Sequence, residues 1–314
     1  MLGIIKSIFL LPKRNSYMNE KLVDYHKKLL GDEFSLFQEW VKKPLRKSVR
    51  VNTIRTSVAG FKEELDGMSA EPIPWCAEGF WVDDRPWGAT IPYLLGYYYI
   101  QEAASMIPAE ALGLEAADIA LDIAAAPGSK ASQMAPRCRT LVANEPSADR
   151  RKVLFSNLNR CGVMNGIITG YDGTRFPRVK FDKILVDAPC SNMGTARKDG
   201  EILKEWTPRM AAGMAPLQKR LLRSAFSLLK PDGKLVYSTC TTAVEENEEV
   251  VLDLLKDGSA RIEKIDLKVK SRPGLLEGTR NCMRVYPWDN DTEFFFVAKI
   301  SKRNKNGEQD TKRA

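Results

Sequence analysis

The sequence has a single histidine, and none of its six cysteines forms a C-x-x-C pair. A zinc site made of cysteine and histidine therefore has almost no ligands to draw on, and we expect no metal centre. Cysteines this scattered in a chain of 314 residues also argue against a disulfide framework. His26 lies in the charged stretch DYHKK and is expected to be a solvated helix residue, so it is excluded as a catalytic general base.

Long apolar runs are also absent, because none approaches the roughly 20 residues that a membrane-spanning helix needs. The apolar stretch over residues 1–12 is interrupted by Lys6 and followed by Lys13 and Arg14. That is the wrong order of charge for a secretory signal, so we expect an amphipathic or frayed helix there. The sequence predicts a soluble, cytoplasmic protein that does not contact a membrane.

Two common nucleotide-binding patterns are missing as well. The small-residue loop AAAPGSK at 124–130 fits neither G-x-G-x-x-G nor G-x-x-x-x-G-K-[ST]. It nevertheless follows a buried strand pattern at 119–124 and precedes a helix pattern, and its small residues would let the backbone approach a ligand closely. The loop therefore favours a nucleotide-like cofactor other than NAD, FAD or ATP.

Positive charge is concentrated near the N-terminus. The formal net charge is +8, and residues 1–62 hold thirteen Lys and Arg against five Asp and Glu, which accounts for the whole excess. A one-sided basic region favours a polyanion partner such as nucleic acid, although a solvated face would show the same pattern. The candidate RNA-binding residues are Lys42, Lys43, Arg46, Lys47, Arg50 and Arg55.

Strand and helix patterns alternate over residues 101–300. The expected strands are 119–124, 140–145, 166–172, 183–189, 234–240, 261–267 and 294–300, and the expected helices are 129–138, 147–162, 208–230 and 245–255. Thr242 and Glu245 have the spacing of a capping box for the last helix. The alternation predicts a mainly parallel sheet covered on both faces, with ligands at the carboxyl ends of its strands.

Three further segments complete the expected organisation. Residues 20–100 read as a smaller basic domain, residues 1–19 as an N-terminal extension, and residues 301–314 as a polar tail that is expected to be disordered.

Acidic residues stand at the ends of four successive predicted strands, namely Asp122, Glu145, Asp172 and Asp187. Glu145 is placed to accept from ribose hydroxyls, and Asp172 from an adenine amino group. Acids near a ligand suit a cationic cofactor without phosphates, such as S-adenosylmethionine with its sulfonium. Strand-end acids that cap nearby helix N-termini are the alternative explanation for any one of them.

Two cysteines follow predicted strands: Cys190 in VDAPCS and Cys240 in VYSTC. A thiolate can add to carbon-6 of a pyrimidine and so make carbon-5 nucleophilic enough to take a methyl group. A neighbouring cation such as Lys130 would help to form the thiolate, because a free cysteine has a pKa of about 8.5. Either cysteine alone could instead be a buried apolar residue.

These residues resemble the Sun/RsmB/RsmF family of S-adenosylmethionine-dependent RNA cytosine-C5 methyltransferases. The resemblance extends from RVNTIRTS at 50–57 to FFFVAKI at 294–300, and LDIAAAPGSK, DAPCS and YSTC followed by EENE carry it. It implies an α/β fold: a Rossmann-like class I methyltransferase domain with a mainly parallel seven-stranded sheet and helices on both faces. A smaller α+β, RRM-like N-terminal domain would precede it.

The resemblance also implies roles for single residues. Cys240 would be the nucleophile, Cys190 would assist product release, and Asp187 would hold the cytosine edge with Lys130 beside it. The S-adenosylmethionine site would comprise Ala124, Ala125, Ala126, Pro127, Gly128, Ser129, Lys130, Glu145, Arg150, Asp172 and Asp187.

The chain departs from the family pattern at three positions: Ala124 replaces the usual cysteine, Ser129 a frequent glycine, and Glu293 precedes the FFF run where glycine is common. We expect a monomer that acts on a structured RNA, tRNA before rRNA, because a compact chain without an evident extra RNA-binding module suggests a small target. The alternatives are a non-catalytic RNA-binding factor with the same fold, and a DNA-type methyltransferase in which Cys190 would attack.

Overall fold

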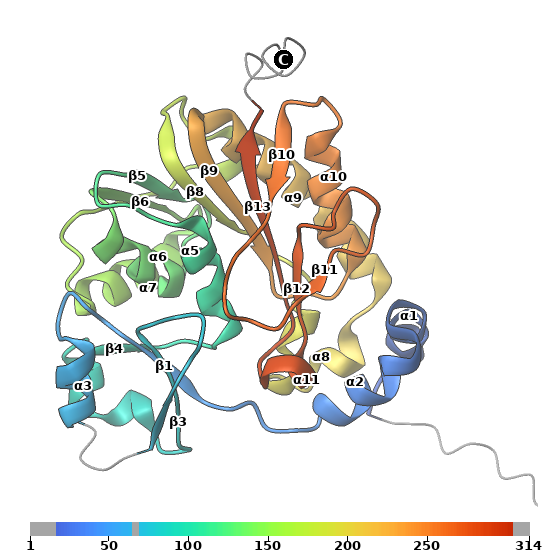
Figure 1. Ribbon diagram of the computed structural model, residues 1–314, viewed down its shortest axis with the longest axis horizontal. Coiled ribbons are helices and arrows are strands. Elements are labelled where there is room, and N and C mark those ends of the chain that lie inside the picture. The colour runs from blue at the N-terminus through green and yellow to red at the C-terminus, as the bar shows by residue number, and fades with distance from the viewer. Residues whose placement is uncertain (1–16, 65–68, 304–314) are drawn as a thin grey trace, which may run out of the picture.

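The computed structural model describes residues 17–64 and 69–303, which form two sheets. The smaller, antiparallel sheet has the order β2-β3-β1-β4 (Figure 1). Its elements are β1 Ser48–Val51, α3 Val58–Glu64, β2 Ala70–Pro72, β3 Gly79–Val82, α4 Ile91–Leu94 and β4 Tyr98–Ile100. Helices between β1 and β2 and between β3 and β4 give the β-α-β-β-α-β order of an RRM-like domain, which confirms the predicted α+β N-terminal domain.

The larger sheet has the order β11-β12-β13-β9-β8-β5-β6-β7, and β10 also pairs with β13. Its strands are β5 Ile119–Asp122, β6 Thr140–Asn144, β7 Gly166–Thr169, β8 Phe181–Asp187, β9 Leu229–Thr239, β10 Ala260–Glu263, β11 Arg272–Pro273, β12 Met283–Val285 and β13 Phe295–Lys302. The strands from β7 to β9 are parallel, whereas β13 runs antiparallel to β9.

The strand count differs from the predicted seven, because this sheet has nine strands within the described residues. The long strand β13 presents an edge that two short partners share: β10 pairs with its carboxyl-terminal half and β12 with its amino-terminal half. Covering this edge removes free backbone groups that could pair with another chain. Strand β13 also continues to Lys302, two residues into the predicted polar tail.

Helices cover both faces of the larger sheet, as predicted. They are α5 Ile107–Leu112, α6 Ser129–Met134 and α7 Ala148–Arg160 on one face, and α9 Pro208–Leu228 and α10 Glu248–Leu255 on the other. Successive strand residues alternate between the two cores: Ala120 packs with the first group, Leu121 with the second. This alternation is the two-residue period of a sheet that is buried on both sides.

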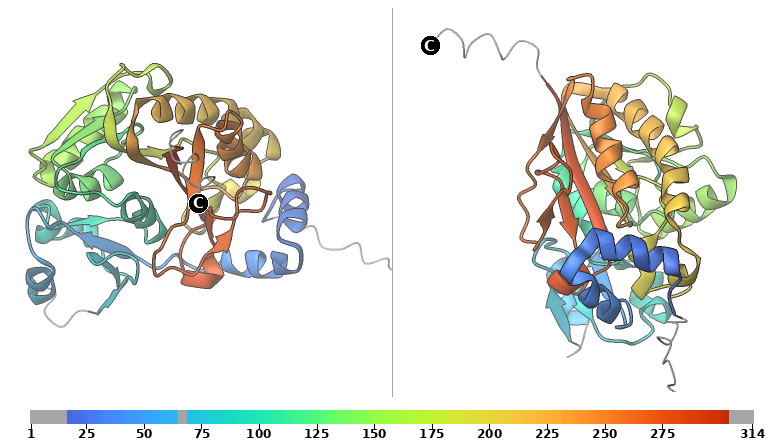
Figure 2. Two further views of the ribbon diagram at one scale, coloured as in Figure 1. Left: turned by 45° about the horizontal axis from the view of Figure 1, so that its top comes forward. Right: turned by 90° about the vertical axis from the view of Figure 1, so that its right-hand side faces the viewer.

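The first two helices, α1 Glu20–Leu30 and α2 Phe34–Trp40, pack against the carboxyl-terminal half of the chain rather than against the small sheet (Figure 2). Leu22 and Phe37 join a core cluster with Trp206 and Phe294. The short helices α8 Ile202–Glu205 and α11 Pro287–Asn290 lie in the same region.

The prediction of a solvated His26 is wrong. The side chain is 0% exposed on α1, with its ring stacked on Phe37 at 4.6 Å. Its Nδ1 donates to the carbonyl of Leu22, which leaves Nε2 to accept from Thr242 Oγ1. Burial lowers the pKa of His26 to about 4. The charged sequence neighbours Asp24, Lys27 and Lys28 are exposed, so their charge says nothing about the face that carries His26.

The predicted capping box is also wrong. Thr242 bonds to His26, and the Glu245 carboxylate accepts from the Tyr25 hydroxyl at 2.6 Å. Helix α10 begins later, at Glu248, after a 3-10 turn over Val244–Glu246. Helix α1 supplies both competing partners, and its position could not be inferred from the local spacing.

Of the helices in the described part of the chain, none combines the length and the apolar character that a bilayer crossing requires. The expectations for residues 1–16, including the apolar first twelve, and for residues 304–314 lie outside the described residues.

Candidate active site

A cavity of about 470 Å³ lies at the carboxyl ends of β5, β8 and β9. In the ribbon view these strand ends face the smaller sheet (Figure 1). This volume is typical of small-molecule sites, and the end of a parallel sheet is where such sites form. Its lining includes Tyr99, Ile100, Glu102, Ser105, Glu145, Asp172, Asp187, Cys190, Asn192, Lys198, Cys240, Glu293 and Phe295.

The two cysteines meet in this cavity. Cys190 follows β8 and Cys240 follows β9, and these strands are parallel neighbours. Their Sγ atoms lie 3.4 Å apart as free thiols. Asn192 Oδ1 accepts from both, at 3.5 Å from Cys190 and 3.3 Å from Cys240. The fold thus places two sulfur atoms side by side in the cavity.

The pKa of Cys240 is raised well above that of a free cysteine. The hydrogen bond with Cys190 is the largest cause, followed by burial and by the negative charge of Asp187. Cys240 therefore rests as a thiol. Although Lys130 is close by, as predicted, its ammonium group donates to Asp187 rather than to a sulfur atom.

Lys130 and Asp187 form the main ion pair of the site. Lys130 Nζ donates to Asp187 Oδ2 at 2.7 Å and to Ser105 Oγ at 2.9 Å, and Ser238 donates to Asp187 Oδ1 at 2.8 Å. Burial alone would lower the pKa of Lys130, but the Asp187 carboxylate outweighs it and raises that pKa. The ion pair and the hydrogen bonds therefore fix both side chains in orientation.

Buried hydrogen bonds support the DAPCS loop, which follows β8 and carries Cys190. Ser191 donates to one oxygen of Glu246, and Gln218 Nε2 donates to the other oxygen and to Pro189 O, each at 2.8 Å. Trp206 Nε1 donates to Ser191 Oγ at 2.8 Å. Glu246 belongs to the EENE motif, so this motif acts here by holding the DAPCS loop.

The other end of the cavity carries the predicted cofactor acids. Glu145 is 2% exposed; its Oε1 accepts from Ser147 N at 2.9 Å, and its Oε2 lies 3.4 Å from Arg150. Asp172 Oδ1 accepts from the backbone and hydroxyl of Thr174. Asp122, by contrast, is buried beneath the loop, where burial and then the charge of Asp187 raise its pKa to about 7.

Nine of the eleven predicted cofactor residues line the cavity: Ala124, Ala126, Pro127, Ser129, Lys130, Glu145, Arg150, Asp172 and Asp187. Ala125 and Gly128 belong to the same loop but do not line the cavity. Ala125 N donates to Asn144 O, and Gly128 has a φ of +111° with its Cα packed close to Leu154. These two residues shape the loop, and glycine at 128 relieves the strain that a side chain would meet at positive φ.

The predicted RNA-binding residue Arg50 does not fit that role. It is 2% exposed on β1, and its guanidinium donates to Gln101 Oε1 and Ser132 Oγ, each at 2.8 Å. Because Ser132 lies on α6, Arg50 joins the small sheet to the helix that follows the cofactor loop. A phosphate at the surface could not reach this side chain.

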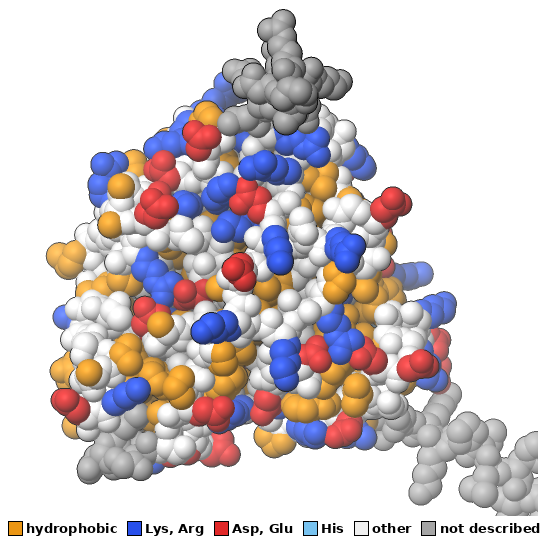
Figure 3. All heavy atoms as spheres, in the orientation of Figure 1, with side chains coloured by type: hydrophobic (Ala, Val, Ile, Leu, Met, Phe, Trp, Pro, Cys, Tyr) orange, Lys and Arg blue, Asp and Glu red, His pale blue; other side chains and the backbone are white. Residues whose placement is uncertain are grey.

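The remaining basic residues lie at the surface. Lys42, Lys47 and Arg55 are exposed, while Arg46 pairs with Glu71, and Lys43 with Glu39 at 2.7 Å. On the face shown in Figure 3, Lys and Arg side chains are interspersed with Asp and Glu side chains.

The segment at 42–47 runs beside the cavity. Arg197 donates to the carbonyls of Lys43 and Pro44, at 3.2 and 2.7 Å, and the next residue, Lys198, lines the cavity. The basic segment is thus joined by hydrogen bonds to the residue that precedes the cavity-lining Lys198.

Sequence reasoning did not assign site roles to Glu102, Ser105, Asn192 or Glu293, all of which line the cavity. Asn192 carried a local signal, because it directly follows DAPCS and adopts a positive φ of 56°, which asparagine tolerates. Glu293 also carried a signal, because it stands before the FFF run at a position where the family commonly has glycine. Glu102 and Ser105 had no recognisable spacing.

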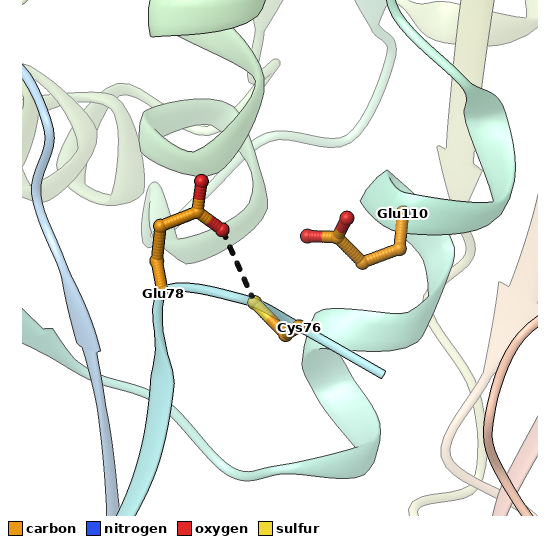
Figure 4. A group of neighbouring side chains, drawn as sticks. All are labelled: Cys76, Glu78 and Glu110. Atoms are coloured by element: carbon orange, nitrogen blue, oxygen red, sulfur yellow. Dashed lines mark hydrogen bonds between the residues drawn. The ribbon is translucent and has the colours of Figure 1, made fainter. Parts of the chain in front are cut away.

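A second cluster of metal-ligating residue types lies away from the cavity. Figure 4 shows Cys76, Glu78 and Glu110 pointing toward one another. Arg137 donates to Glu78 at 2.5 Å and to Glu110 at 2.7 Å, so both carboxylates already share a cation. The cluster therefore works as an ion-pair link between the small sheet and α5.

Comparison with known proteins adds a family assignment to this geometry. The family model of 16S rRNA methyltransferase RsmB/F matches residues 109–301, and that of the N-terminal domain of 16S rRNA methyltransferase RsmF matches residues 18–103. The ribosomal RNA small subunit methyltransferase F of Vibrio campbellii is 41% identical over 92% of this chain, which spans 64% of that relative's length.

A second relative, the tRNA (cytosine(49)-C(5))-methyltransferase of Pyrococcus abyssi, is also 41% identical, over 91% of this chain and 96% of that protein. Among solved structures, a methyltransferase homolog protein from Pyrococcus horikoshii matches with a TM-score of 0.79 at 33% identity, over 90% of this chain and 94% of that chain. NSun6 from Pyrococcus horikoshii matches with a TM-score of 0.83 at 23% identity, covering 92% of this chain and all of that one.

Proposed function

Because this chain belongs to the RsmB/F methyltransferase family, we propose that it transfers a methyl group from S-adenosylmethionine to carbon-5 of a cytosine in RNA. The observation that carries this proposal is the pair of thiols 3.4 Å apart, at the ends of adjacent parallel strands and beside the Lys130–Asp187 ion pair. Pyrimidine C5 methylation needs a sulfur nucleophile and a polar group for the base in one pocket.

The cavity fits S-adenosylmethionine by the chemistry of its lining. The carboxylates of Glu145 and Asp172 can accept from ribose hydroxyls and an adenine amino group, and the backbone at 124–127 lets a ligand approach closely. S-adenosylmethionine, when bound there, would supply an electrophilic methyl group on its sulfonium and leave as S-adenosylhomocysteine. The acidic lining suits that cationic ligand better than a phosphate-bearing one.

Cys240 is the proposed nucleophile. Once one thiol proton of the pair has passed to water, Cys190 can hold the remaining proton while the Cys240 thiolate adds to carbon-6. The electrons of the carbon-5–carbon-6 double bond then become available at carbon-5. Asp187 orients the base through its polar edge, and Lys130 fixes that carboxylate.

Release completes the cycle after carbon-5 has taken the methyl group. A base removes the carbon-5 proton, the carbon-5–carbon-6 double bond re-forms, and the sulfur–carbon-6 bond breaks to free the Cys240 thiolate. Cys190 is the residue we propose to assist this step, since its sulfur atom lies 3.4 Å from that of Cys240.

The test is incubation with tritiated S-adenosylmethionine and RNA that lacks the modification, followed by nucleoside analysis. Label in 5-methylcytidine is expected. Cys240→Ala should abolish it while cofactor binding survives, whereas Cys190→Ala should accumulate a protein–RNA adduct that persists on a denaturing gel. Full turnover by Cys240→Ala would overturn the assignment, and cofactor binding without any labelled RNA would favour a non-catalytic RNA-binding role.

For the substrate we propose tRNA, with rRNA as the second candidate. The Pyrococcus abyssi relative, 96% of whose length this chain covers, is named for a tRNA cytosine. Both family models and the Vibrio relative are named for small-subunit rRNA. Label confined to the small-RNA fraction would support tRNA. Label confined to 16S rRNA would replace tRNA with the second candidate.

A further inference from the structure

Glu293 lies in the candidate active site, and one of its carboxyl oxygens has no hydrogen-bond partner among the described residues. It is 5% exposed and lines the cavity that also holds Cys240 and Asp187. Its Oε1 atom is fully buried and has no hydrogen-bond partner within residues 17–64 and 69–303. Buried polar atoms are bonded in the large majority of cases, so an unpartnered carboxyl oxygen beside a ligand cavity points to a partner that arrives with the ligand.

The backbone fixes Glu293 next to the nucleophile. Gly194 N donates to Cys240 O at 2.8 Å, and Gly194 O accepts from Phe294 N at 3.4 Å, so one residue bridges the two segments. A Cβ atom at position 194 would lie 2.5 Å from Phe294 O and 2.6 Å from Cys240 O. Only glycine allows this close approach, and the position of Glu293 relative to Cys240 is therefore a built feature of the fold.

Burial, together with the neighbouring Glu102, keeps the carboxyl group of Glu293 neutral. Glu102 lies against it: Glu102 Oε1 accepts from Glu293 N at 3.1 Å, and its other oxygen accepts from Ser105 N at 2.9 Å. Burial and then the charge of Glu102 raise the pKa of Glu293 to about 8, against the opposing effects of Lys198, Arg197 and Lys130. At neutral pH the carboxyl group therefore carries a proton and can donate it in a hydrogen bond.

We propose that Glu293 is a further substrate-binding residue, whose neutral carboxyl group donates a hydrogen bond to the O2 carbonyl of the target cytosine. The proposal rests on the proposed function. With the Asp187 carboxylate accepting from the exocyclic amine of the base, O2 is an acceptor on the polar edge that Asp187 cannot serve and that needs a donor. Electron density moves toward O2 when sulfur adds to carbon-6, so this bond is stronger in the adduct than in the free base and favours its formation.

The test compares wild type, Glu293→Gln and Glu293→Ala by kcat/KM for RNA methylation between pH 6 and 9.5. Alanine removes the donor, and we expect a loss of about 100- to 1,000-fold, in the range found when one preorganised donor is deleted. Glutamine keeps a donor that does not titrate, so it should be at least tenfold more active than alanine. Wild type should lose activity above about pH 8 as Glu293 ionises, and Glu293→Gln should lack this alkaline limb.

A second readout separates binding of the base from folding. RNA that carries 5-fluorocytosine at the target should trap the Cys240 adduct more slowly in Glu293→Ala than in Glu293→Gln, while S-adenosylmethionine binding stays equal. Glu249→Gln, which changes an exposed acid on α10, is the matched control.

The outcomes are distinct. If glutamine is as damaging as alanine, Glu293 acts as an ionised carboxylate and the donor role is overturned. If alanine matches wild type in both assays, Glu293 does not contact the base. Wild type that forms no 5-methylcytidine would instead overturn the proposed function itself.

Discussion

His26 shows how one buried side chain links distant parts of the chain. It lies on α1, yet its ring accepts a hydrogen bond from Thr242, two residues beyond the candidate nucleophile Cys240. Its burial results from contacts with Phe37 and Trp206, which lie on other elements. The first helix thereby supports the loop that follows the nucleophile.

This burial predicts a specific pH dependence of stability. The pKa of His26 is about 4 in the folded state and about 6.5 when unfolded, so the unfolded state binds the proton more tightly. The contribution is complete above pH 6.5 and is lost as pH falls toward 4. Between pH 7.5 and pH 5.0 the loss should be about 2 kcal/mol, at 1.36 kcal/mol per pH unit below 6.5.

Urea unfolding at these two pH values checks the prediction. Wild type should lose about 2 kcal/mol more than His26→Gln over this interval, because glutamine does not titrate and the carboxylates common to both proteins cancel. Equal losses in the two proteins would mean that His26 is not buried in the neutral form.

For single residues, the sequence correctly predicted which side chains meet at the carboxyl ends of the strands. Cys190, Cys240 and Asp187 meet in one cavity because carboxyl ends of parallel strands share one edge of a sheet. Arg50 and His26 were misassigned because a polar residue in a charged stretch looks exposed. Their burial depends on partners 51 to 82 residues away for Arg50 and 216 away for His26.

Among the elements, α10 carries two ion pairs that differ in burial. Glu248, in its first turn, forms a two-bond pair with Arg284 of β12, each bond at 2.6 Å, and neither side chain is more than 2% exposed. Asp253, near its carboxyl end, pairs with Arg223 of α9, whose side chain is 55% exposed. The two pairs provide a test of burial on a single helix.

We expect Arg284→Met to lower the free energy of unfolding by about 3–5 kcal/mol, because it leaves the Glu248 carboxylate buried without its cation. Arg223→Met, at the exposed pair, should cost less than about 1 kcal/mol. Denaturant unfolding of the two variants makes the comparison. A double change, Glu248→Met with Arg284→Met, should recover much of the loss, and failure to do so would show that shape rather than charge dominates there.

The bounds of a strand could be predicted where the local sequence pattern determines them. Strands β5, β6 and β8 lie within three residues of their predicted bounds, because each is an apolar run ended by a polar or small residue. The start of α10 was missed because Thr242 and Glu245 found partners on α1. The short strands β11 and β12 were missed because they owe their conformation to the free edge of β13.

For the whole molecule, the cavity depends on both sheets. Tyr99 and Ile100 of β4 and the following Glu102 line it from one side, and the strand ends of the larger sheet from the other. Arg50 joins β1 to α6, and Asn52 donates to the carbonyl of Cys161, just beyond α7, at 2.7 Å. The alternating pattern of strands and helices predicted the fold class. The hydrogen bonds that join the two sheets could not be predicted, because no local motif indicates which distant residues pair.

The surface around this cavity bears on RNA binding. Lys42 and Arg55 are exposed, and the segment that contains Lys42 is held beside the cavity by Arg197, whereas the guanidinium of Arg46 is paired with Glu71. A cation that neutralises a phosphate releases a counterion, so each such contact adds about 0.7–0.9 to the slope of log affinity against log salt concentration.

Lys42→Ala and Arg55→Ala should each reduce that slope by about this amount and weaken RNA binding without changing the affinity for S-adenosylmethionine. Arg46→Ala should change the slope less, because its charge is already balanced by Glu71. Titration of labelled RNA at 50, 100 and 200 mM salt measures all three. Unchanged slopes for Lys42→Ala and Arg55→Ala would mean that the basic segment is a solvated face. The phosphate contacts would then have to come from cations at the cavity mouth, of which Lys198 is the first to test.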